Sequence, residues 1–282
     1  MPSRDTPPGD HATDSQHAQI AFQPCEIEHR YGADVHILAD PLGLSLLSRL
    51  SAKGVVQPEV RRLCVHLYRL LAHVVLSAEF PRRVTSTETR MIDSTARGIW
   101  TGETLALDSP TVVVALARAG LIPSQIIYDF LNEVLDPSQV RQDHLSLGRQ
   151  VDPAGRVTGA SLDAAKIGGS VNDAILLIPD PMGATGVTVS TALAHYGAAV
   201  HGRPRKVIAV HLIVTPEYLR SVRDLQPKVT VYALRLDRGL SSPEILRTIP
   251  GTRWADERGL DDHHYIVPGA GGLGEVLNNS FV

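Results

Sequence analysis

The chain has 282 residues, of which 43% are hydrophobic and 20% charged, so it can bury a full core in one large domain or two small ones. Its formal net charge of -3 supplies no basic field that would gather nucleic acid or an anionic membrane, and we predict neither as a partner. Cys25 and Cys64 are too few for a disulfide scaffold or a thiolate metal site, which favours a cytoplasmic location.

The N-terminal segment is rich in proline, aspartate, histidine and serine and lacks an apolar run. We therefore expect residues 1–22 to be a disordered tail, neither a signal peptide nor a membrane anchor. Residues 23–282 are expected to form a single domain. No stretch of the sequence approaches the roughly 20 apolar residues that span a bilayer.

The middle of the chain alternates between helical and strand patterns. Apolar residues recur at three- and four-residue steps over residues 60–75, which predicts a packed helix. Short apolar runs rich in β-branched residues predict buried parallel strands, and two further helices are expected near residues 189–196 and 218–225. This alternation predicts an α/β fold, a parallel β-sheet flanked by helices, with a ligand at the carboxyl ends of the strands. The predicted strands are residues 111–116, 174–178, 207–214 and 229–234.

Residues 180–188 read Asp-Pro-Met-Gly-Ala-Thr-Gly-Val-Thr and connect a predicted strand to a predicted helix. The main-chain N–H groups that open such a helix can point at one phosphate, and the hydroxyls of Thr185 and Thr188 can add to the hold. Asp180 can accept hydrogen bonds from ribose hydroxyls. The spacing alone also fits a simple turn and helix cap. A phosphosugar site and a structural turn are both open on these grounds.

Three motifs resemble the uracil phosphoribosyltransferase family, and they occur in the family's order. Residues 180–188 are similar to its loop for 5-phosphoribosyl-1-pyrophosphate (PRPP), Asp-Pro-Met-Leu-Ala-Thr-Gly-Gly-Thr, except at Gly183 and Val187. Residues 117–121, Ala-Arg-Ala-Gly-Leu, resemble its pyrophosphate loop. Residues 259–269, with Gly-Leu followed by Tyr-Ile-Val-Pro-Gly, resemble its uracil loop. The resemblance covers roughly residues 35–282.

The resemblance implies a phosphoribosyltransferase fold with a carboxyl-terminal base-binding hood, and transfer of the phosphoribosyl group from PRPP to uracil. The implied products are UMP and pyrophosphate, the implied cofactor is Mg²⁺, and the implied assembly is a homodimer. Asp180 and Arg118 are the implied catalytic residues. The base is expected to be held by Tyr265, Ile266, Gly271, Gly272 and Leu273, largely through main-chain groups. PRPP is expected to be held by Arg118, Ala119, Gly120, Asp180, Met182, Gly183, Ala184, Thr185, Gly186, Val187 and Thr188.

The last motif departs from the family at a charged position. Where the family reads Gly-Asp-x-Gly-Asp-Arg, residues 271–276 read Gly-Gly-Leu-Gly-Glu-Val. Two alternatives therefore stay open, namely transfer to a different pyrimidine-like heterocycle and a noncatalytic homologue that binds PRPP or a nucleotide. We predict that uracil is turned over poorly and that Gly272→Asp raises its turnover about tenfold, unless Gly272 has a positive φ.

Residues 238–257 are interpreted as an insertion, because Arg-Gly-Leu at residue 238 is echoed by Arg-Gly-Leu at residue 258. The segment contains Pro243, Pro250 and Trp254, which is typical of a loop. It is either a lid over the base site or a surface elaboration without a role in the chemistry.

Overall fold

The structure is a computed structural model that describes residues 14–151 and 157–280. Its centre is an eight-stranded sheet in which the main path runs β1-β10-β9-β7-β4-β5-β6 and β8 pairs with β9. All neighbouring strands are parallel except β5 and β6. The strands are β1 (Val35–Ile37), β4 (Thr111–Ala117), β5 (Val140–Val151), β6 (Val157–Lys166), β7 (Ile175–Pro179), β8 (Met182–Gly183), β9 (Lys206–Val214) and β10 (Val229–Leu236).

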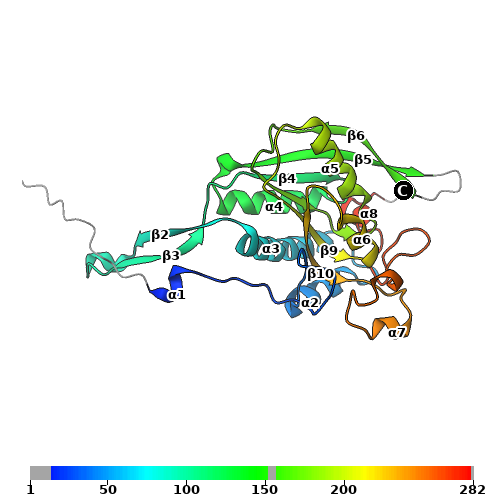
Figure 1. The fold of residues 1–282 in the computed structure, drawn as a ribbon, viewed down its shortest axis with the longest axis horizontal. Helices are drawn as coiled ribbons and strands as arrows, with labels where there is room; N and C mark the ends of the chain where they lie inside the picture. Colours follow the sequence, from blue (N-terminus) through cyan, green and yellow to red (C-terminus); the bar gives the residue numbers. More distant parts are fainter. Residues whose placement is uncertain (1–13, 152–156, 281–282) are drawn as a thin grey trace, which may run out of the picture.

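Helices cover both faces of this sheet (Figure 1). Alternate residues of β4 show how the faces divide, because Val113 packs in the core with α3 and α4, whereas Val112 and Val114 pack in the core with α5 and α6. Burial on both faces explains why the strands are continuous apolar runs. The helices are α2 (Pro41–Leu50), α3 (Glu59–Glu79), α4 (Leu121–Val134), α5 (Val187–Ala199), α6 (Pro216–Val222) and α8 (Leu273–Asn278), and a 3-10 turn, η2 (Pro137–Gln139), precedes β5.

The predicted α/β architecture is confirmed. Each of the four predicted strands is present, as β4, β7, β9 and β10, with ends shifted by no more than two residues. The three predicted helices correspond to α3, α5 and α6, although α3 is longer than its apolar pattern indicated. None of the helices within residues 14–151 and 157–280 has the length and apolar composition that a bilayer crossing requires.

An antiparallel hairpin that the sequence did not predict projects from the body (Figure 1). It consists of β2 (Arg82–Glu88) and β3 (Ile99–Leu105), joined through η1 (Arg90–Asp93). A short helix, α1 (Ser15–Ala18), lies against it, because the Trp100 indole donates a hydrogen bond to His17 at 3.0 Å and the Ile20 N–H donates to Glu103 at 2.9 Å. Residues 14–22 therefore differ from the expected disordered tail, since the hairpin supplies partners for their polar groups. Residues 1–13 of that expectation lie outside the described residues.

The expected insertion, residues 238–257, folds around one buried ion pair. Arg238 bonds the carboxylate of Glu257 at 2.9 Å and also donates to main-chain carbonyls that follow α7 (Pro243–Leu246). Glu257 is fully buried and accepts the hydroxyl of Tyr31 as well. Trp254, at the start of η3 (Trp254–Asp256), stacks edge-on against Tyr31 with ring centroids 5.0 Å apart. These contacts hold residues 238–257 against the N-terminal part of the domain. They favour a surface elaboration over a lid that moves across the base site.

Candidate active site

The Arg118 loop, residues 118–120, follows β4 and opens α4. The peptide bond between Ala117 and Arg118 is cis. The Arg118 side chain is exposed and donates a hydrogen bond to the hydroxyl of Ser280 at 3.1 Å. A Cβ placed on Gly120 would lie 2.7 Å from the carbonyl oxygen of Leu116 and 2.9 Å from that of Pro179. Only glycine therefore lets this loop pack directly against the end of β7.

The Asp180 loop, residues 180–188, begins at the end of β7, beside the Arg118 loop. Asp180 continues the pairing of β7 with β9, because its N–H donates to the Val210 carbonyl at 3.1 Å. Burial raises the pKa of the Asp180 carboxyl to about 6, although a hydrogen bond from the Met182 N–H opposes the shift. The ionised form of this carboxyl is therefore poorly solvated in the structure.

The start of α5 provides main-chain donors. Gly186 precedes the helix with φ +82°, and a Cβ there would lie 2.8 Å from the Ser221 hydroxyl, so glycine is required on both counts. The first helical hydrogen bond is from the Ser190 N–H to the Gly186 carbonyl at 3.0 Å. The amides just before Ser190 consequently have no carbonyl one turn earlier within the helix. Such a helix start is suited to an anion.

Gly183, which departs from the family pattern, fits tightly against the neighbouring residues of this chain. A Cβ at Gly183 would lie 2.9 Å from Cγ1 of Val214 and 3.2 Å from Cγ of Tyr218. Tyr218 is fully buried in α6. The aromatic ring fills the space that a larger residue at position 183 needs, so the loop keeps its path with a different side chain beneath it.

The connection after β9 joins the Asp180 loop to the carboxyl-terminal loop, residues 259–272. The Thr215 hydroxyl donates to the Ala184 carbonyl at 2.7 Å, which fixes the Asp180 loop from below. The Glu217 carboxylate accepts the Gly259 N–H at 2.9 Å, which fixes the start of the carboxyl-terminal loop. Both residues stand at the start of α6, where the sequence indicated only a helix start.

Asp237, at the end of β10, anchors the far side of the carboxyl-terminal loop. Its buried carboxylate accepts the Gly269 N–H at 2.7 Å and is held by the guanidinium of Arg235 at 2.6 and 2.8 Å. The same guanidinium donates to the Gly269 carbonyl at 2.9 Å. The buried Asp237 carboxylate and the half-buried Arg235 guanidinium together fix the turn that precedes the predicted base contacts.

The carboxyl-terminal loop ends where α8 begins, and its glycines have different roles. Gly271 has φ +67°, whereas Gly272 has φ −74°, a conformation open to any residue. A Cβ at Gly272 would lie 2.5 Å from Oε2 of Glu275. The carboxylate of Glu275 thus lies where a side chain at position 272 would start. A Cβ at Gly274 would lie 3.0 Å from Cβ of Ala119, which places α8 against the Arg118 loop.

The structure therefore brings the three predicted motifs to one edge of the sheet. Gly120 meets the end of β7, Ala119 meets Gly274, and Arg118 reaches Ser280. Two predicted base-binding side chains point apart, since Ile266 is 7% exposed in the core and Tyr265 is 42% exposed. A contact from Ile266 to a base could then come only from its main chain.

Two residues beneath the Asp180 loop were missed by the sequence analysis. His211 of β9 donates from Nδ1 to the Asp180 carbonyl at 2.6 Å, and the Tyr218 hydroxyl lies 2.6 Å from its Nε2. Burial lowers the pKa of His211 to about 4. A lone histidine within the apolar run of residues 207–214 was the signal that could have found this pair.

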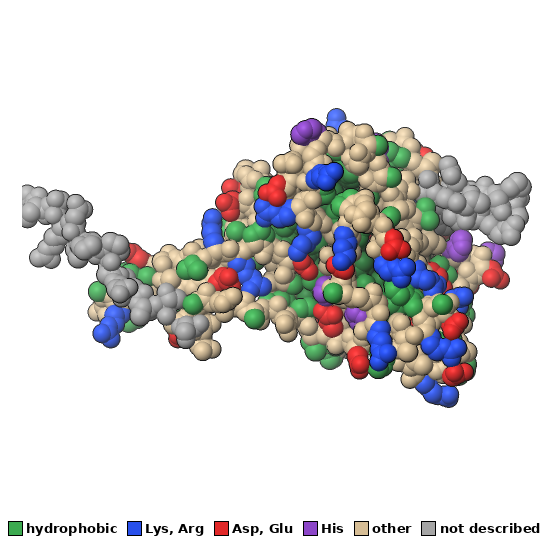
Figure 2. All heavy atoms as spheres, in the orientation of Figure 1, with side chains coloured by type: hydrophobic (Ala, Val, Ile, Leu, Met, Phe, Trp, Pro, Cys, Tyr) green, Lys and Arg blue, Asp and Glu red, His purple; other side chains and the backbone are tan. Residues whose placement is uncertain are grey.

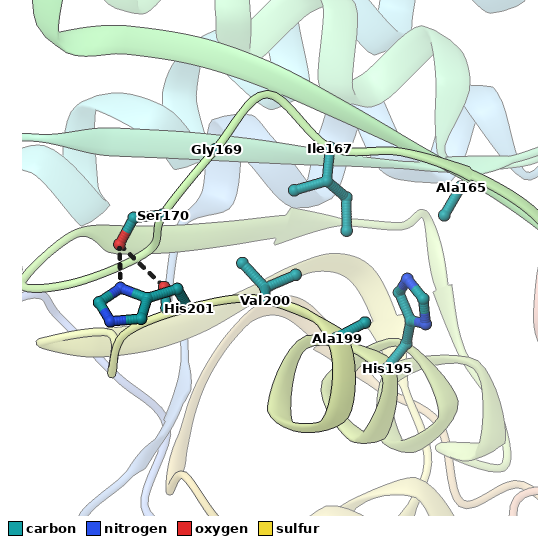
Figure 3. Close-up of a pocket in the computed structure, with 8 residues that line it drawn as sticks. All are labelled: Ala165, Ile167, Gly169, Ser170, His195, Ala199, Val200 and His201. Carbon is teal, nitrogen blue, oxygen red and sulfur yellow. Dashed lines mark hydrogen bonds between the residues drawn. The ribbon is translucent and has the colours of Figure 1, made fainter.

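One pocket lies elsewhere on the molecule, between β6 and the carboxyl end of α5 (Figure 3). It has a volume of about 400 Å³, and in this view His195 and His201 stand at its two ends with Ile167 and Val200 between them. The Asp180 loop joins the opposite end of α5. The pocket is thus separated from the three loops by the length of a helix.

Comparisons with known proteins agree with the motifs. A family model described as uracil phosphoribosyltransferase matches residues 37–253. The uracil phosphoribosyltransferase of Polaromonas naphthalenivorans is 26% identical over 245 residues, covering 87% of this chain and 98% of that protein. That of Pyrobaculum islandicum is 26% identical over 241 residues, covering 85% of this chain and 94% of that protein.

Among solved structures, AQ2163 protein from Aquifex aeolicus is similar in fold. Its TM-score is 0.63 at 21% identity, and the match covers 86% of this chain and 97% of that chain. With the family model matching most of the sequence, the conclusion is that this chain belongs to the uracil phosphoribosyltransferase family.

Proposed function

We propose that this protein transfers the phosphoribosyl group of PRPP to uracil, giving UMP and pyrophosphate. The observation that carries the proposal is the convergence of three loops from the ends of β4, β7 and β10, locked together at Gly120, Ala119 and Gly274. In this fold class a ligand binds where the loops from the carboxyl ends of the strands meet. PRPP carries a phosphate, a ribose and a pyrophosphate, and the residues of these loops can contact each of the three groups separately.

The Asp180 loop supplies the contacts for the 5-phosphate and the ribose in this proposal. Amides at the start of α5 and the hydroxyls of Thr185 and Thr188 suit the phosphate. Ionised Asp180 accepts hydrogen bonds from the ribose hydroxyls, and the raised pKa of its carboxyl means that binding weakens as the pH falls below about 6.

Arg118 is proposed to receive the pyrophosphate. Its guanidinium is exposed at the end of β4, and its present contact is a neutral hydroxyl, Ser280, which a phosphate can displace. Departure of pyrophosphate leaves positive charge on the sugar, so the rate depends on holding the reactants in line and on stabilising the leaving anion. The amides of Ala119 and Gly120 add to that stabilisation.

The uracil ring is proposed to bind main-chain groups of residues 266–273. The Asp237 and Arg235 pair holds the turn at Gly269, so the peptide groups of Ile266 and Gly271 keep fixed directions. An amide that pairs with a ring carbonyl rejects analogues without that carbonyl, since the buried amide would be left unpaired.

The donor set fits a Mg²⁺ ion that is carried largely by the substrate. The described residues contain no group of three or more His, Cys, Asp and Glu side chains arranged for a metal. Mg²⁺ commonly uses one or two carboxylates together with substrate phosphates and water. Asp180 and Glu275 are the carboxylates of this chain that would hold it, and the ion would neutralise charge on the leaving pyrophosphate.

The projecting hairpin supports a homodimer. Two-stranded ribbons have little stability alone, and this one exposes Val84 (60%) and Met91 (56%). Figure 2 shows hydrophobic side chains on the surface of the projection, with charged side chains beside them. A second copy is the partner we propose for the hairpin. A cytoplasmic location is proposed from Cys25 and Cys64, both of which are free thiols.

The test is formation of UMP and pyrophosphate when the protein is mixed with PRPP, Mg²⁺ and uracil. A panel of cytosine, thymine, orotate and the purine bases run in parallel identifies the preferred acceptor. We expect uracil to give the highest kcat/KM. Preference for another base would reassign the substrate, and PRPP binding with no turnover of any base would favour the noncatalytic alternative.

A further inference from the structure

The hydrogen bonds of His211 have a defined direction. Nδ1 lies 2.6 Å from the main-chain carbonyl oxygen of Asp180, which can only accept, so Nδ1 carries a proton. The ring is fully buried and its two nitrogens bond only a carbonyl and a hydroxyl, so an imidazolium would have no anionic partner and Nε2 carries no proton. The hydroxyl of Tyr218, 2.6 Å from Nε2, is therefore the donor of the second bond.

Tyr218 is also held by contacts other than the one to His211. Its ring, which lies edge-on to the imidazole with centroids 4.6 Å apart, fills the space beside Gly183. Its N–H donates to the Thr215 hydroxyl at 3.0 Å at the start of α6. Burial raises the pKa of the Tyr218 hydroxyl well above its ordinary value, so the hydroxyl keeps its proton.

Asp180 is thus bonded on both sides of its α carbon. Its N–H donates to the Val210 carbonyl at 3.1 Å, and its carbonyl accepts from His211. The next residue, Pro181, accepts from the Leu212 N–H at 3.1 Å. The direction of the Asp180 side chain follows from these main-chain bonds, since a rotation of either peptide group would turn its Cβ.

We propose that His211 and Tyr218 are positioning residues for Asp180: Tyr218 fixes the imidazole in its Nδ1–H form, and that form fixes the Asp180 carbonyl. This inference rests on the proposed function, in which the Asp180 carboxylate contacts the ribose of PRPP. A ring proton moved to Nε2 would leave two acceptors facing each other at the Asp180 carbonyl. The carboxylate would then leave its productive direction while the amides at the start of α5 remained in place.

Tyr218→Phe tests the pair, and Tyr196→Phe is its matched control. Tyr196 is also a buried tyrosine, but its hydroxyl bonds Asp143 at 2.8 Å, on the β5 side of the sheet. Both variants lose one buried hydrogen bond, so both are expected to lose similar thermal stability. Only Tyr218→Phe should lower kcat/KM for PRPP, by about tenfold, with the KM for uracil unchanged within about twofold. Equal kcat/KM values in the two variants would reduce the pair to a structural role.

Variants of His211 give a second readout. His211→Asn keeps a donor near the position of Nδ1, whereas His211→Leu keeps none. We expect the asparagine variant to retain several-fold more kcat/KM for PRPP than the leucine variant. Equal values would overturn the inference, and if His211→Leu fails to fold, the comparison of Tyr218→Phe with Tyr196→Phe still decides the matter.

The tautomer itself can be measured without turnover. Long-range ¹H–¹⁵N correlation on histidine-labelled protein should show His211 as the Nδ1–H form at pH 7, with the signal assigned from its loss in His211→Asn. An imidazolium or an Nε2–H ring in the wild type would overturn the inference. Calorimetry separates the two proposals: wild type that binds no PRPP refutes the proposed function, whereas wild type and Tyr218→Phe that bind it equally refute only the positioning role.

Discussion

The Asp180 loop and the carboxyl-terminal loop both depart from the family pattern, and the structure accounts for the two departures differently. In the Asp180 loop, Gly183 stands where the family has leucine, and the ring of Tyr218 from α6 fills the space. The change at position 183 is one of side-chain volume. Asp180, Thr185 and Gly186 are the same residues as in the family pattern. A volume lost in one element can be restored by another that packs on it.

In the carboxyl-terminal loop, Gly272 stands where the family has an acid, and the departure concerns charge. The carboxylate of Glu275, three residues later on α8, lies within 2.5 Å of the position of a Cβ at residue 272. A carboxylate thus lies at this point from one helical turn away, although the family pattern has an acid at position 275 as well, so this chain keeps one of the two acids. The comparison teaches that a changed motif residue must be judged from its spatial neighbours before a function is called lost.

The largest expected effect is at the unchanged centre of the Asp180 loop. Asp180→Asn keeps the shape but removes the charge that accepts the ribose hydroxyls, so kcat/KM for PRPP should fall about 100-fold, a typical effect for one fixed electrostatic contact. Steady-state kinetics and calorimetry with Mg²⁺ and PRPP measure it. Asp173→Asn is the control, since Asp173 pairs with Arg205 on the surface before β7. Equal affinity in wild type and Asp180→Asn would remove the ribose contact from the proposal.

The Arg118 loop lies between the Asp180 loop and the carboxyl-terminal loop, since it packs against the end of β7 and against α8. Arg118→Ala should lower kcat roughly 30-fold, about 2 kcal/mol, and change the KM for uracil much less, because the lost contact is to the leaving anion. Arg69→Ala, which removes an exposed arginine paired with Glu133, should leave kcat unchanged. An unchanged kcat in Arg118→Ala would exclude the guanidinium from the reacting centre.

The carboxyl-terminal loop is tested by moving its charge. Gly272 has a negative φ, so Gly272→Asp would not strain the backbone. Because the Glu275 carboxylate already lies beside this position, we do not expect a tenfold gain in uracil turnover from that substitution alone. We expect Glu275→Gln to lower uracil turnover about tenfold and Gly272→Asp to restore it in that background, which corresponds to about 1.4 kcal/mol. In the wild-type background Gly272→Asp should change turnover less than about threefold.

The controls for this series are internal. Gly271→Asp introduces the same side chain one residue earlier, where φ is +67°, and should disrupt the loop in either background. If Glu275→Gln leaves turnover unchanged, the carboxylate of Glu275 does not replace an acid at position 272, and the departure in this loop is a true loss of charge.

The sequence predicted the parts of the fold that rest on continuous apolar patterns. Strands β4, β7, β9 and β10 are buried on both faces, so their residues had to be apolar throughout. The β2–β3 hairpin was missed because most of its β2 side chains are exposed and its strands pair through hydroxyls, such as Thr85 with Thr104 at 3.1 Å. Nothing in its own sequence requires a core.

The residues of the candidate site also differ in whether the sequence could reveal them. The three loops could be found because each is a short contiguous motif at a strand end. For the His211 and Tyr218 pair the sequence offers only a lone histidine in an apolar run. Its contacts, like the position of the Glu275 carboxylate, depend on distances that no local pattern specifies. The anchoring role of Asp237 was missed for the same reason, since its partner Gly269 is 32 residues later in the chain.

The last expected effect is on stability, and its sign is opposite to that on activity. The pKa of Asp180 is raised to about 6 by burial, above its ordinary value of 3.8, so between these values the folded protein binds more protons than the unfolded chain. Wild-type stability should therefore fall as the pH rises through this window, by about 3 kcal/mol at most. Asp180→Asn does not carry this cost.

Thermal melts of Asp180→Asn and wild type should therefore differ with pH. At pH 8 the variant should melt several degrees higher, about 2–4 °C for each kcal/mol in a chain of this size, and near pH 4 the difference should largely disappear. Asp173→Asn should behave oppositely, because the Arg205 hydrogen bond lowers the pKa of Asp173, so its loss matters above that pKa and vanishes as the pH falls. A constant difference between Asp180→Asn and wild type at both pH values would mean that burial of charge at Asp180 costs the fold nothing.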